Sequence, residues 1–328
     1  MRRRDFCTGI AGVAAAAWPV FSHAQQKPMP VVGFLHAGRQ AATARYLAVF
    51  RRTLAEAGFV EGQNVAIEAR WADDHYDRLP SLANELVARR VDVIATVGAR
   101  NTGQAARQAT STIPIVFGTG GDPVASGFAT SMARPDGNLT GVNYVVSDLG
   151  PKRLDLIAQM VPQSRLMAAL MNPQSTATEE AAREMQAAAQ RQGLQLLVVT
   201  ATSEREVDEA FAAAAERRAG GLVVQADPFI HSRRGQLIAL AARHRLPTIY
   251  TWREFAEEGG LITYGPSLAA VYRQIAVYVA RILRGAKPGD LPIVRPDTFD
   301  LVVNLKTAKA LGLTLPPTIL ALADEIID

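Results

Sequence analysis

From residue 30 onward, short apolar runs alternate with longer segments in which apolar residues recur every three or four positions. This alternation is typical of parallel strands joined by crossover helices, so it predicts an α/β fold. The strands are expected at 30–35, 64–68, 91–97, 113–117 and 139–142, then at 166–171, 194–200, 221–225, 247–250, 261–263 and 299–303.

The helical segments divide the strands into two similar units with no Gly/Ser linker between them. We therefore expect two Rossmann-like lobes with parallel sheets that face each other. In open parallel sheets a ligand binds at the carboxyl ends of the strands, so the sequence predicts a cleft between the lobes. Helices are expected at 42–57, 77–90, 179–192, 204–217, 268–283 and 307–311.

The first 24 residues have the pattern of an export signal. Arg2, Arg3 and Arg4 precede an apolar stretch at 10–21 that is too short to span a bilayer. Small residues in Ser22-His23-Ala24 predict cleavage after Ala24, and Arg3-Arg4-Asp5-Phe6 fits the R-R-x-F core of a twin-arginine signal. We expect a periplasmic protein; the general secretory route and an uncleaved anchor are the alternatives.

Composition excludes several classes of function. The net charge of +4 falls to about +2 once the leader is removed, and only 6% of residues are aromatic, so the basic surface of a nucleic-acid binder is absent. Cys7, the single cysteine, lies in the leader. The glycine-rich stretch 118–123 lacks nucleotide-binding spacing, and Asp73, Asp74, His75 and Asp77 are better explained by a helix start than by a metal site. We expect no cofactor, no metal and no enzymatic activity.

The candidate ligand-binding residues follow the ends of predicted strands. Arg100 and Asn101 open a helix, where free amides and the helix dipole favour an anion, and Asp227 lies at the matching place in the second unit. A surface arginine and a helix N-cap are the respective alternatives. The other candidates are polar or aromatic residues near strand ends, for which ordinary packing is the alternative: His36, Thr119, Asp122, Tyr144, Asn172, Tyr250, Trp252 and Tyr264.

Several stretches, in order along nearly the whole chain, resemble the substrate-binding proteins of ABC transporters, of the type represented by tryptophan- and tyrosine-binding receptors. The stretch Asn-Leu-Thr-Gly within 135–141 is among the most recognisable. The others are Val-Gly-Phe-Leu at 32–35, Gly-Phe-Val-Glu-Gly-Gln-Asn at 58–64, Tyr-Asp-Arg-Leu at 76–79, Gly-Asp-Pro-Val at 121–124 and Asn-Leu-Lys-Thr-Ala at 304–308.

This resemblance implies a type I periplasmic-binding fold with three hinge crossings, an N-terminal lobe of 29–143 and 264–293, and a C-terminal lobe of 144–263 and 294–328. It implies a monomer that delivers a small molecule to a membrane permease. A sensor subunit for a signalling partner and an α/β enzyme are the alternative functions.

The sequence departs from the aromatic amino-acid receptors at two places. Those receptors commonly have Thr-Pro where this chain has Arg100-Asn101, and they tend to have an acid where it has Trp252. Gaining a guanidinium and losing a carboxylate favours a net anionic ligand over a zwitterion.

Overall fold

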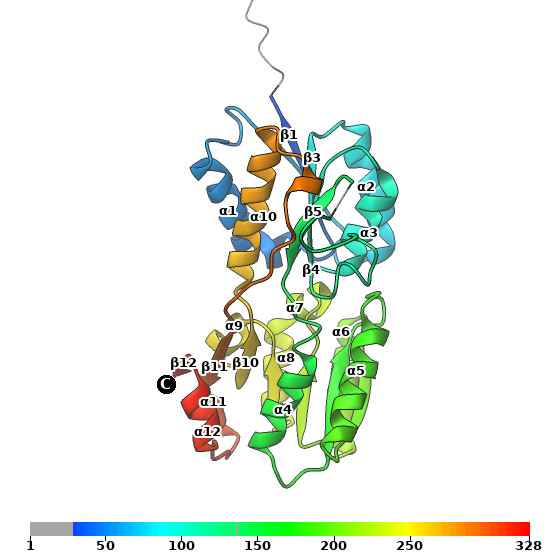
Figure 1. Ribbon diagram of the computed structural model, residues 1–328. Coiled ribbons are helices and arrows are strands. Elements are labelled where there is room, and N and C mark those ends of the chain that lie inside the picture. The colour runs from blue at the N-terminus through cyan, green and yellow to red at the C-terminus, as the bar shows by residue number, and fades with distance from the viewer. Residues whose placement is uncertain (1–28, 136) are drawn as a thin grey trace, which may run out of the picture.

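The computed structural model describes residues 29–135 and 137–328, which form two α/β lobes placed end to end (Figure 1). The predicted leader, with its arginine pair and its cleavage site after Ala24, lies outside the described residues and stays a prediction. Among the described residues no helix is long and apolar enough to cross a bilayer, and no three His, Cys, Asp or Glu side chains gather as metal ligands would.

The N-terminal lobe contains a parallel five-stranded sheet in the order β2-β1-β3-β4-β5. Its strands are β1 (Val31–His36), β2 (Ala66–Trp71), β3 (Val93–Val97), β4 (Ile115–Thr119) and β5 (Leu139–Asn143). The helices of this lobe are α1 (Gln40–Glu56), α2 (Leu79–Ala88), α3 (Arg100–Ala109) and α10 (Leu268–Leu283), with 3₁₀ turns at Tyr76–Arg78 and Pro288–Asp290.

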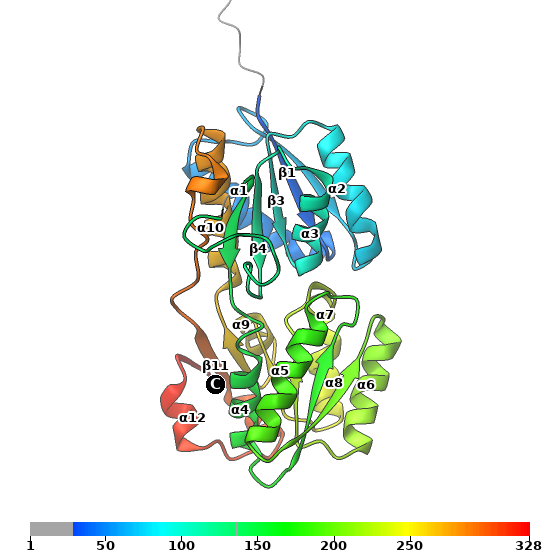
Figure 2. The same ribbon diagram turned by 45° about the vertical axis from the view of Figure 1, so that its right-hand side comes forward.

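Alternate residues of β1 supply both faces of that sheet, because successive side chains of a strand point to opposite sides. Phe34 packs in one apolar cluster with Phe50 of α1 and Ile275 of α10. Leu35 packs in another with Leu86 of α2. Helices α1 and α10 therefore cover one face, and α2 and α3 cover the other (Figure 2).

The C-terminal lobe contains a seven-stranded sheet in the order β12-β11-β10-β9-β8-β6-β7. Its strands are β6 (Leu166–Met171), β7 (Gln195–Thr200), β8 (Gly221–Val224), β9 (Thr248–Tyr250), β10 (Ile262–Gly265), β11 (Asp300–Asn304) and β12 (Glu325–Ile327). Its helices are α4 (Gly150–Met160), α5 (Thr178–Arg191), α6 (Glu204–Glu216), α7 (Pro228–Ser232), α8 (Arg234–Arg243), α9 (Arg253–Glu257), α11 (Leu305–Ala310) and α12 (Pro317–Leu322).

The α/β fold with two sheets is confirmed, with corrections of detail. The expectation of wholly parallel sheets was wrong for β11, which pairs antiparallel with β10. Strand β2 begins at Ala66 rather than at residue 64, because the Asn64 side chain instead accepts from the amide of Val60 and donates to the carbonyl of Gly58. Sequence patterns did not reveal α12 or β12; β12 extends the sheet at its edge.

The segments 144–149, 266–267 and 292–299 connect the two sheets. Two of them run beside each other, since the amide of Asn143 donates to the carbonyl of Val294 at 2.9 Å. The Asn-Leu-Thr-Gly stretch supports this junction: Thr140 Oγ1 donates to the Leu291 carbonyl at 2.7 Å, and a Cβ at Gly141 would collide with the carbonyl oxygen of Phe117. The predicted lobe boundaries stay a prediction, although β10 extends to Gly265 within the second sheet.

Candidate functional site

The carboxyl ends of strands from both lobes meet at the junction and line a pocket, which we call the aromatic chamber. Strand ends supply one part of its wall, and helices α1, α7 and α10 supply the rest. The lining residues are His36, Gly38, Ala42, Thr43, Tyr46, Val97, Gly98, Tyr144, Ala226, Asp227, Pro228, His231, Trp252, Leu268 and Tyr272.

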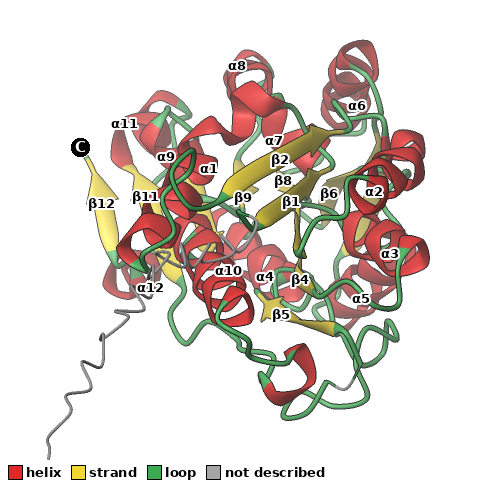
Figure 3. Cartoon of the chain, turned by 90° about the horizontal axis from the view of Figure 1, so that it is seen from above, coloured by secondary structure: helices red, strands yellow, loops and turns green. Residues whose placement is uncertain are grey.

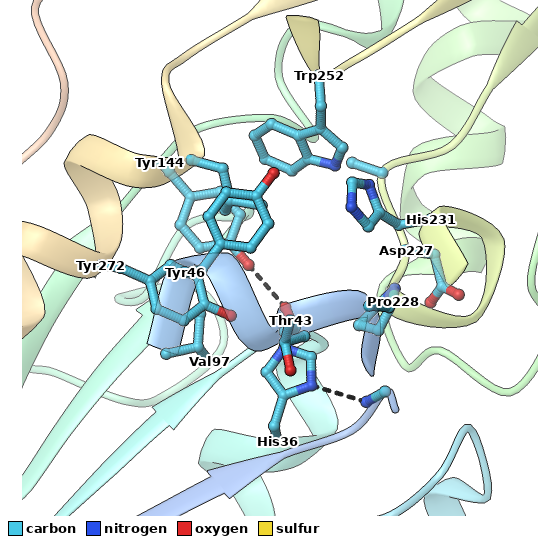
Figure 4. A pocket seen from close by; sticks show the side chains of 15 residues that line it. His36, Thr43, Tyr46, Val97, Tyr144, Asp227, Pro228, His231, Trp252 and Tyr272 are labelled. Carbon is cyan, nitrogen blue, oxygen red and sulfur yellow. Dashed lines mark hydrogen bonds between the residues drawn. The ribbon is translucent and has the colours of Figure 1, made fainter. Parts of the chain in front are cut away.

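Aromatic rings from both lobes form the walls of this chamber (Figure 4). Tyr46 of α1 stacks on Tyr272 of α10 with 5.2 Å between ring centroids, and both belong to the N-terminal lobe. Tyr144 of the junction lies 6.1 Å from Trp252, which follows β9 in the C-terminal lobe. His231 of α7 lies 6.2 Å from the Tyr46 ring across the junction. Such walls suit a flat or apolar ligand.

The two histidines of the aromatic chamber are neutral at pH 7. Burial lowers the pKa of His36 to about 4 and that of His231 to about 3, where the cation of Arg234 also contributes. His36 Nδ1 accepts from the amide of Gly38 at 2.9 Å, so the proton of the neutral ring lies on Nε2. The chamber thus carries no histidine charge.

Asp227 is buried and its acceptor positions are largely filled. As N-cap of α7, its Oδ1 accepts from the amides of Phe229 and Ile230 and from Asn172 Nδ2 at 3.0 Å. Its Oδ2 accepts from Tyr76 Oη of the other lobe at 2.8 Å. Burial raises the pKa of Asp227 to about 6. Figure 4 shows the carboxylate turned away from the centre of the chamber, so Asp227 joins the lobes.

A second pocket, the polar chamber, shares Gly98, Tyr144 and Ala226 with the first. The shared wall is fixed because Tyr144 Oη donates to the Gly98 carbonyl at 2.7 Å. Within residues 29–135 and 137–328, the rest of its lining includes two arginines and no acid. These lining residues are Ala99, Arg100, Thr119, Gly120, Gly121, Val146, Ser147, Gly150, Arg153, Met171, Ser175, Ala177, Ala181, Met185, Val223 and Gln225.

Side chains at the start of α3 reach across the junction. Arg100 forms an ion pair of 2.8 Å with Glu180 of α5. Asn101 Nδ2 donates to the carbonyl of Gln174 at 3.0 Å, and its Oδ1 accepts from the amide of Thr176 at 3.1 Å. These contacts hold the edge of the polar chamber shut.

Further contacts between the lobes lie around the aromatic chamber. Arg45 of α1 pairs with the buried Glu254 of α9 at 2.6 Å. Asp74 accepts from Ser232 Oγ at 3.1 Å and pairs with Arg233 at 3.5 Å. Because ion pairs and hydrogen bonds join the lobes on several sides, the described arrangement is a closed one.

The structure brings together most of the residues nominated from the sequence. His36, Asp227 and Trp252 line the aromatic chamber, Arg100 and Thr119 line the polar chamber, and Tyr144 lines both. Asn172 touches Asp227, and Asn101 bridges the lobes beside Arg100. Whether any of them binds ligand stays a prediction.

Five nominated residues lie outside both chambers: Asn101 and Asn172, whose contacts are given above, and Asp122, Tyr250 and Tyr264. Asp122 Oδ1 accepts from the amide of Val124 at 2.7 Å, so this carboxylate caps its own turn. Tyr250 is fully buried and stacks on Phe255 with 4.3 Å between centroids. Tyr264 lies against Phe299. Sequence reasoning missed the residues that helices contribute to the chambers, foremost Thr43, Tyr46, Arg153, His231 and Tyr272.

Two α/β lobes closed over a cavity at their strand ends define a solute-binding protein of the periplasmic type. Residues 41–327 match the family described as ABC transporter substrate binding protein. The chain therefore belongs to this family, whose members are binding proteins and not enzymes.

Individual relatives agree with this assignment. A tyrosine-binding protein of Clostridioides difficile is 23% identical over 265 residues, which are 80% of this chain and 75% of that protein. A conserved domain protein from Vibrio cholerae superposes with a TM-score of 0.83 at 26% identity, covering 91% of this chain and 99% of the other. A domain from Streptococcus pneumoniae in complex with L-Trp gives 0.81 at 22% identity, with the same coverage.

Proposed function

We propose that this protein is the exported receptor of an ABC importer and captures a small organic solute with an aromatic or flat apolar body in the aromatic chamber. The observation that carries the proposal is the composition of that chamber, where Tyr46 and Tyr272 of one lobe face Trp252 and His231 of the other. A solute there touches both lobes only when they are closed.

Closure of this kind needs a ligand that interacts more strongly with the closed form. A planar ring that buries about 150 Å² of apolar surface contributes about 4 kcal/mol. In the open form only one wall of the chamber would cover the ring. The ligand would therefore shift the protein toward the closed form, which the permease would recognise.

Export precedes this task in the proposal. The leader would be removed after Ala24, and the folded chain would work in the periplasm beside a membrane permease. The family assignment supports an extracytoplasmic location and a permease partner, and the arginine pair at Arg3 and Arg4 favours the twin-arginine route.

Native mass spectrometry of the protein purified without denaturation tests whether it binds a solute, because a tightly bound solute co-purifies with the protein. Because the relatives include a tyrosine-binding protein and a domain in complex with L-Trp, L-tyrosine and L-tryptophan are the first ligands to titrate by calorimetry, alongside the co-purified solute. Trp252→Ala should weaken binding of that solute at least tenfold. Phe59→Ala, which removes a half-buried ring at the far end of α1, should leave binding unchanged. Equal affinity in both variants, or no bound solute and no probe binding, would refute the proposal.

A further inference from the structure

The polar chamber contains a buried cation that has no counterion among the described residues. Arg153, in the first turn of α4, is 3% exposed and forms no ion pair among the described residues. Its guanidinium donates to the carbonyls of Val146 at 2.8 Å and Tyr264 at 3.4 Å, while Nε has no hydrogen-bond partner. A buried charge in this state is costly unless a partner of opposite charge arrives.

Three helices begin at this chamber, and their dipoles add to the positive charge. Ala99 precedes α3, Gly150 is the first residue of α4, and Ala177 precedes α5, and all three line the chamber. None of the three helices has a side-chain cap at its N-terminus. Figure 2 places α3 on one side of the junction and α4 and α5 on the other, so both lobes direct helix amides toward this region.

The acids near the chamber do not neutralise Arg153. Glu180 pairs with Arg100 at the edge, and no Asp or Glu of the part of the chain that the structure describes lines the cavity. Thr119 Oγ1 and Arg100 Nε are also buried there without a hydrogen-bond partner. Burial lowers the pKa of Arg153 to about 10, which still leaves it protonated at pH 7.

We propose that the polar chamber is the subsite for a carboxylate group of the solute, with Arg153 as its principal partner. This proposal rests on the proposed function, since the apolar body of the same solute would occupy the aromatic chamber and its carboxylate would reach past Tyr144, which lines both cavities. The solute class is then an aromatic carboxylate without an α-ammonium group. An ammonium would find no acid in the polar chamber, and the acceptor positions of Asp227 are largely occupied.

Calorimetric titration at pH 7 with 3-phenylpropionate, its amide and L-phenylalanine tests the assignment. The wild-type protein should bind the acid at least tenfold more tightly than the uncharged amide and more tightly than L-phenylalanine. Arg153→Met should reduce the affinity for the acid to that for the amide. Lys152→Met removes a cation from the neighbouring, exposed position and should preserve the discrimination.

A purely structural role of Arg153 would give a different pattern of affinities and melting temperatures. If this arginine only holds the Val146 and Tyr264 carbonyls, Arg153→Met would lower the unliganded melting temperature and weaken binding of acid and amide alike. Equal wild-type binding of acid and amide, binding of neither, or tighter binding of L-phenylalanine would overturn the assignment. The assignment would also be overturned if acetate alone bound with the same dependence on Arg153. The chamber would then bind a free anion and not the carboxylate of a larger solute.

The co-purified solute separates this inference from the proposed function. A neutral solute found in the native protein, with binding lost in Trp252→Ala, would overturn the carboxylate subsite and leave the receptor function intact. An aromatic carboxylate whose affinity drops at least tenfold in Arg153→Met would support both.

Discussion

Tyr76 of the N-terminal lobe donates its hydroxyl to Asp227 of the C-terminal lobe at 2.8 Å, and both side chains are buried. The pairing joins two helix starts, because Tyr76 begins a 3₁₀ turn and Asp227 caps α7. Opening the lobes would separate the two residues and return both to water. We therefore expect this hydrogen bond to be lost when the lobes open and to favour the closed form.

Tyr76→Phe should weaken solute binding about tenfold, because a hydrogen bond to a charged group contributes on the order of 1.5 to 3 kcal/mol. Small-angle scattering should show a larger radius of gyration for the variant at equal solute concentration. Tyr278→Phe is the matched control: its hydroxyl donates to the Pro292 carbonyl at 2.6 Å without bridging the lobes. Equal losses in the two variants would show that the contact between lobes has no special role.

Thermal stability should fall as the pH drops from 7 to 5. In the unfolded chain His36 and His231 take up protons near pH 6.5, but in the folded chain they do so only near their lowered pKa values of about 4 and 3. Their stabilising effect is complete above pH 6.5 and declines as the pH falls toward 4. Asp227 acts oppositely: its pKa is raised to about 6 from 3.8, so acidification through that range relieves the cost of its buried charge. The two histidines favour the unfolded form on acidification and the single carboxylate favours the folded form, so the net effect is a loss of stability.

His36→Gln should remove most of the fall in melting temperature between pH 6.5 and 5, because proton uptake by the one remaining buried histidine is then largely offset by proton uptake at Asp227. The glutamine oxygen keeps an acceptor for the Gly38 amide. His75→Gln makes the same substitution at an exposed histidine and serves as the matched control. Melting curves recorded at several pH values test this, and an identical slope for wild type and His36→Gln would contradict the assignment.

The fold could be predicted from the sequence because its inner strands, such as β3 and β8, are buried on both faces and segments of helical periodicity separate the strands. His36, Asp227 and Trp252 could be found because parallel strands place their carboxyl ends at one edge. Tyr46 and Arg153 could not, because each lies within a helix whose apolar face resembles ordinary core. The closure that brings Arg153, Tyr144 and Arg100 around one cavity depends on contacts between distant segments, which local patterns do not report.

The predicted export signal lies outside the described residues and can be tested directly. The mature protein should begin at Gln25, because Ser22-His23-Ala24 presents small residues for cleavage. N-terminal sequencing of the exported protein checks the site, and another first residue would disprove it. Arg3→Lys combined with Arg4→Lys should retain the protein in the cytoplasm; unaffected export would point to the general secretory route.

The glycine of the Asn-Leu-Thr-Gly stretch should be among the least replaceable residues near the junction. Gly141 of β5 pairs with Phe117 of β4, and a Cβ at this position would collide with the Phe117 carbonyl oxygen and crowd its ring. Backbone atoms of two paired strands cannot move apart without losing ladder hydrogen bonds, so Gly141→Ala should destabilise the protein by about 1 to 3 kcal/mol. Gly235→Ala is the matched control, because nothing lies within 4 Å of a Cβ there and alanine favours the helix α8. Urea unfolding of both variants measures the difference. A Gly141→Ala protein as stable as Gly235→Ala would show that the strands can accommodate the side chain, and the steric reason for this glycine would be wrong.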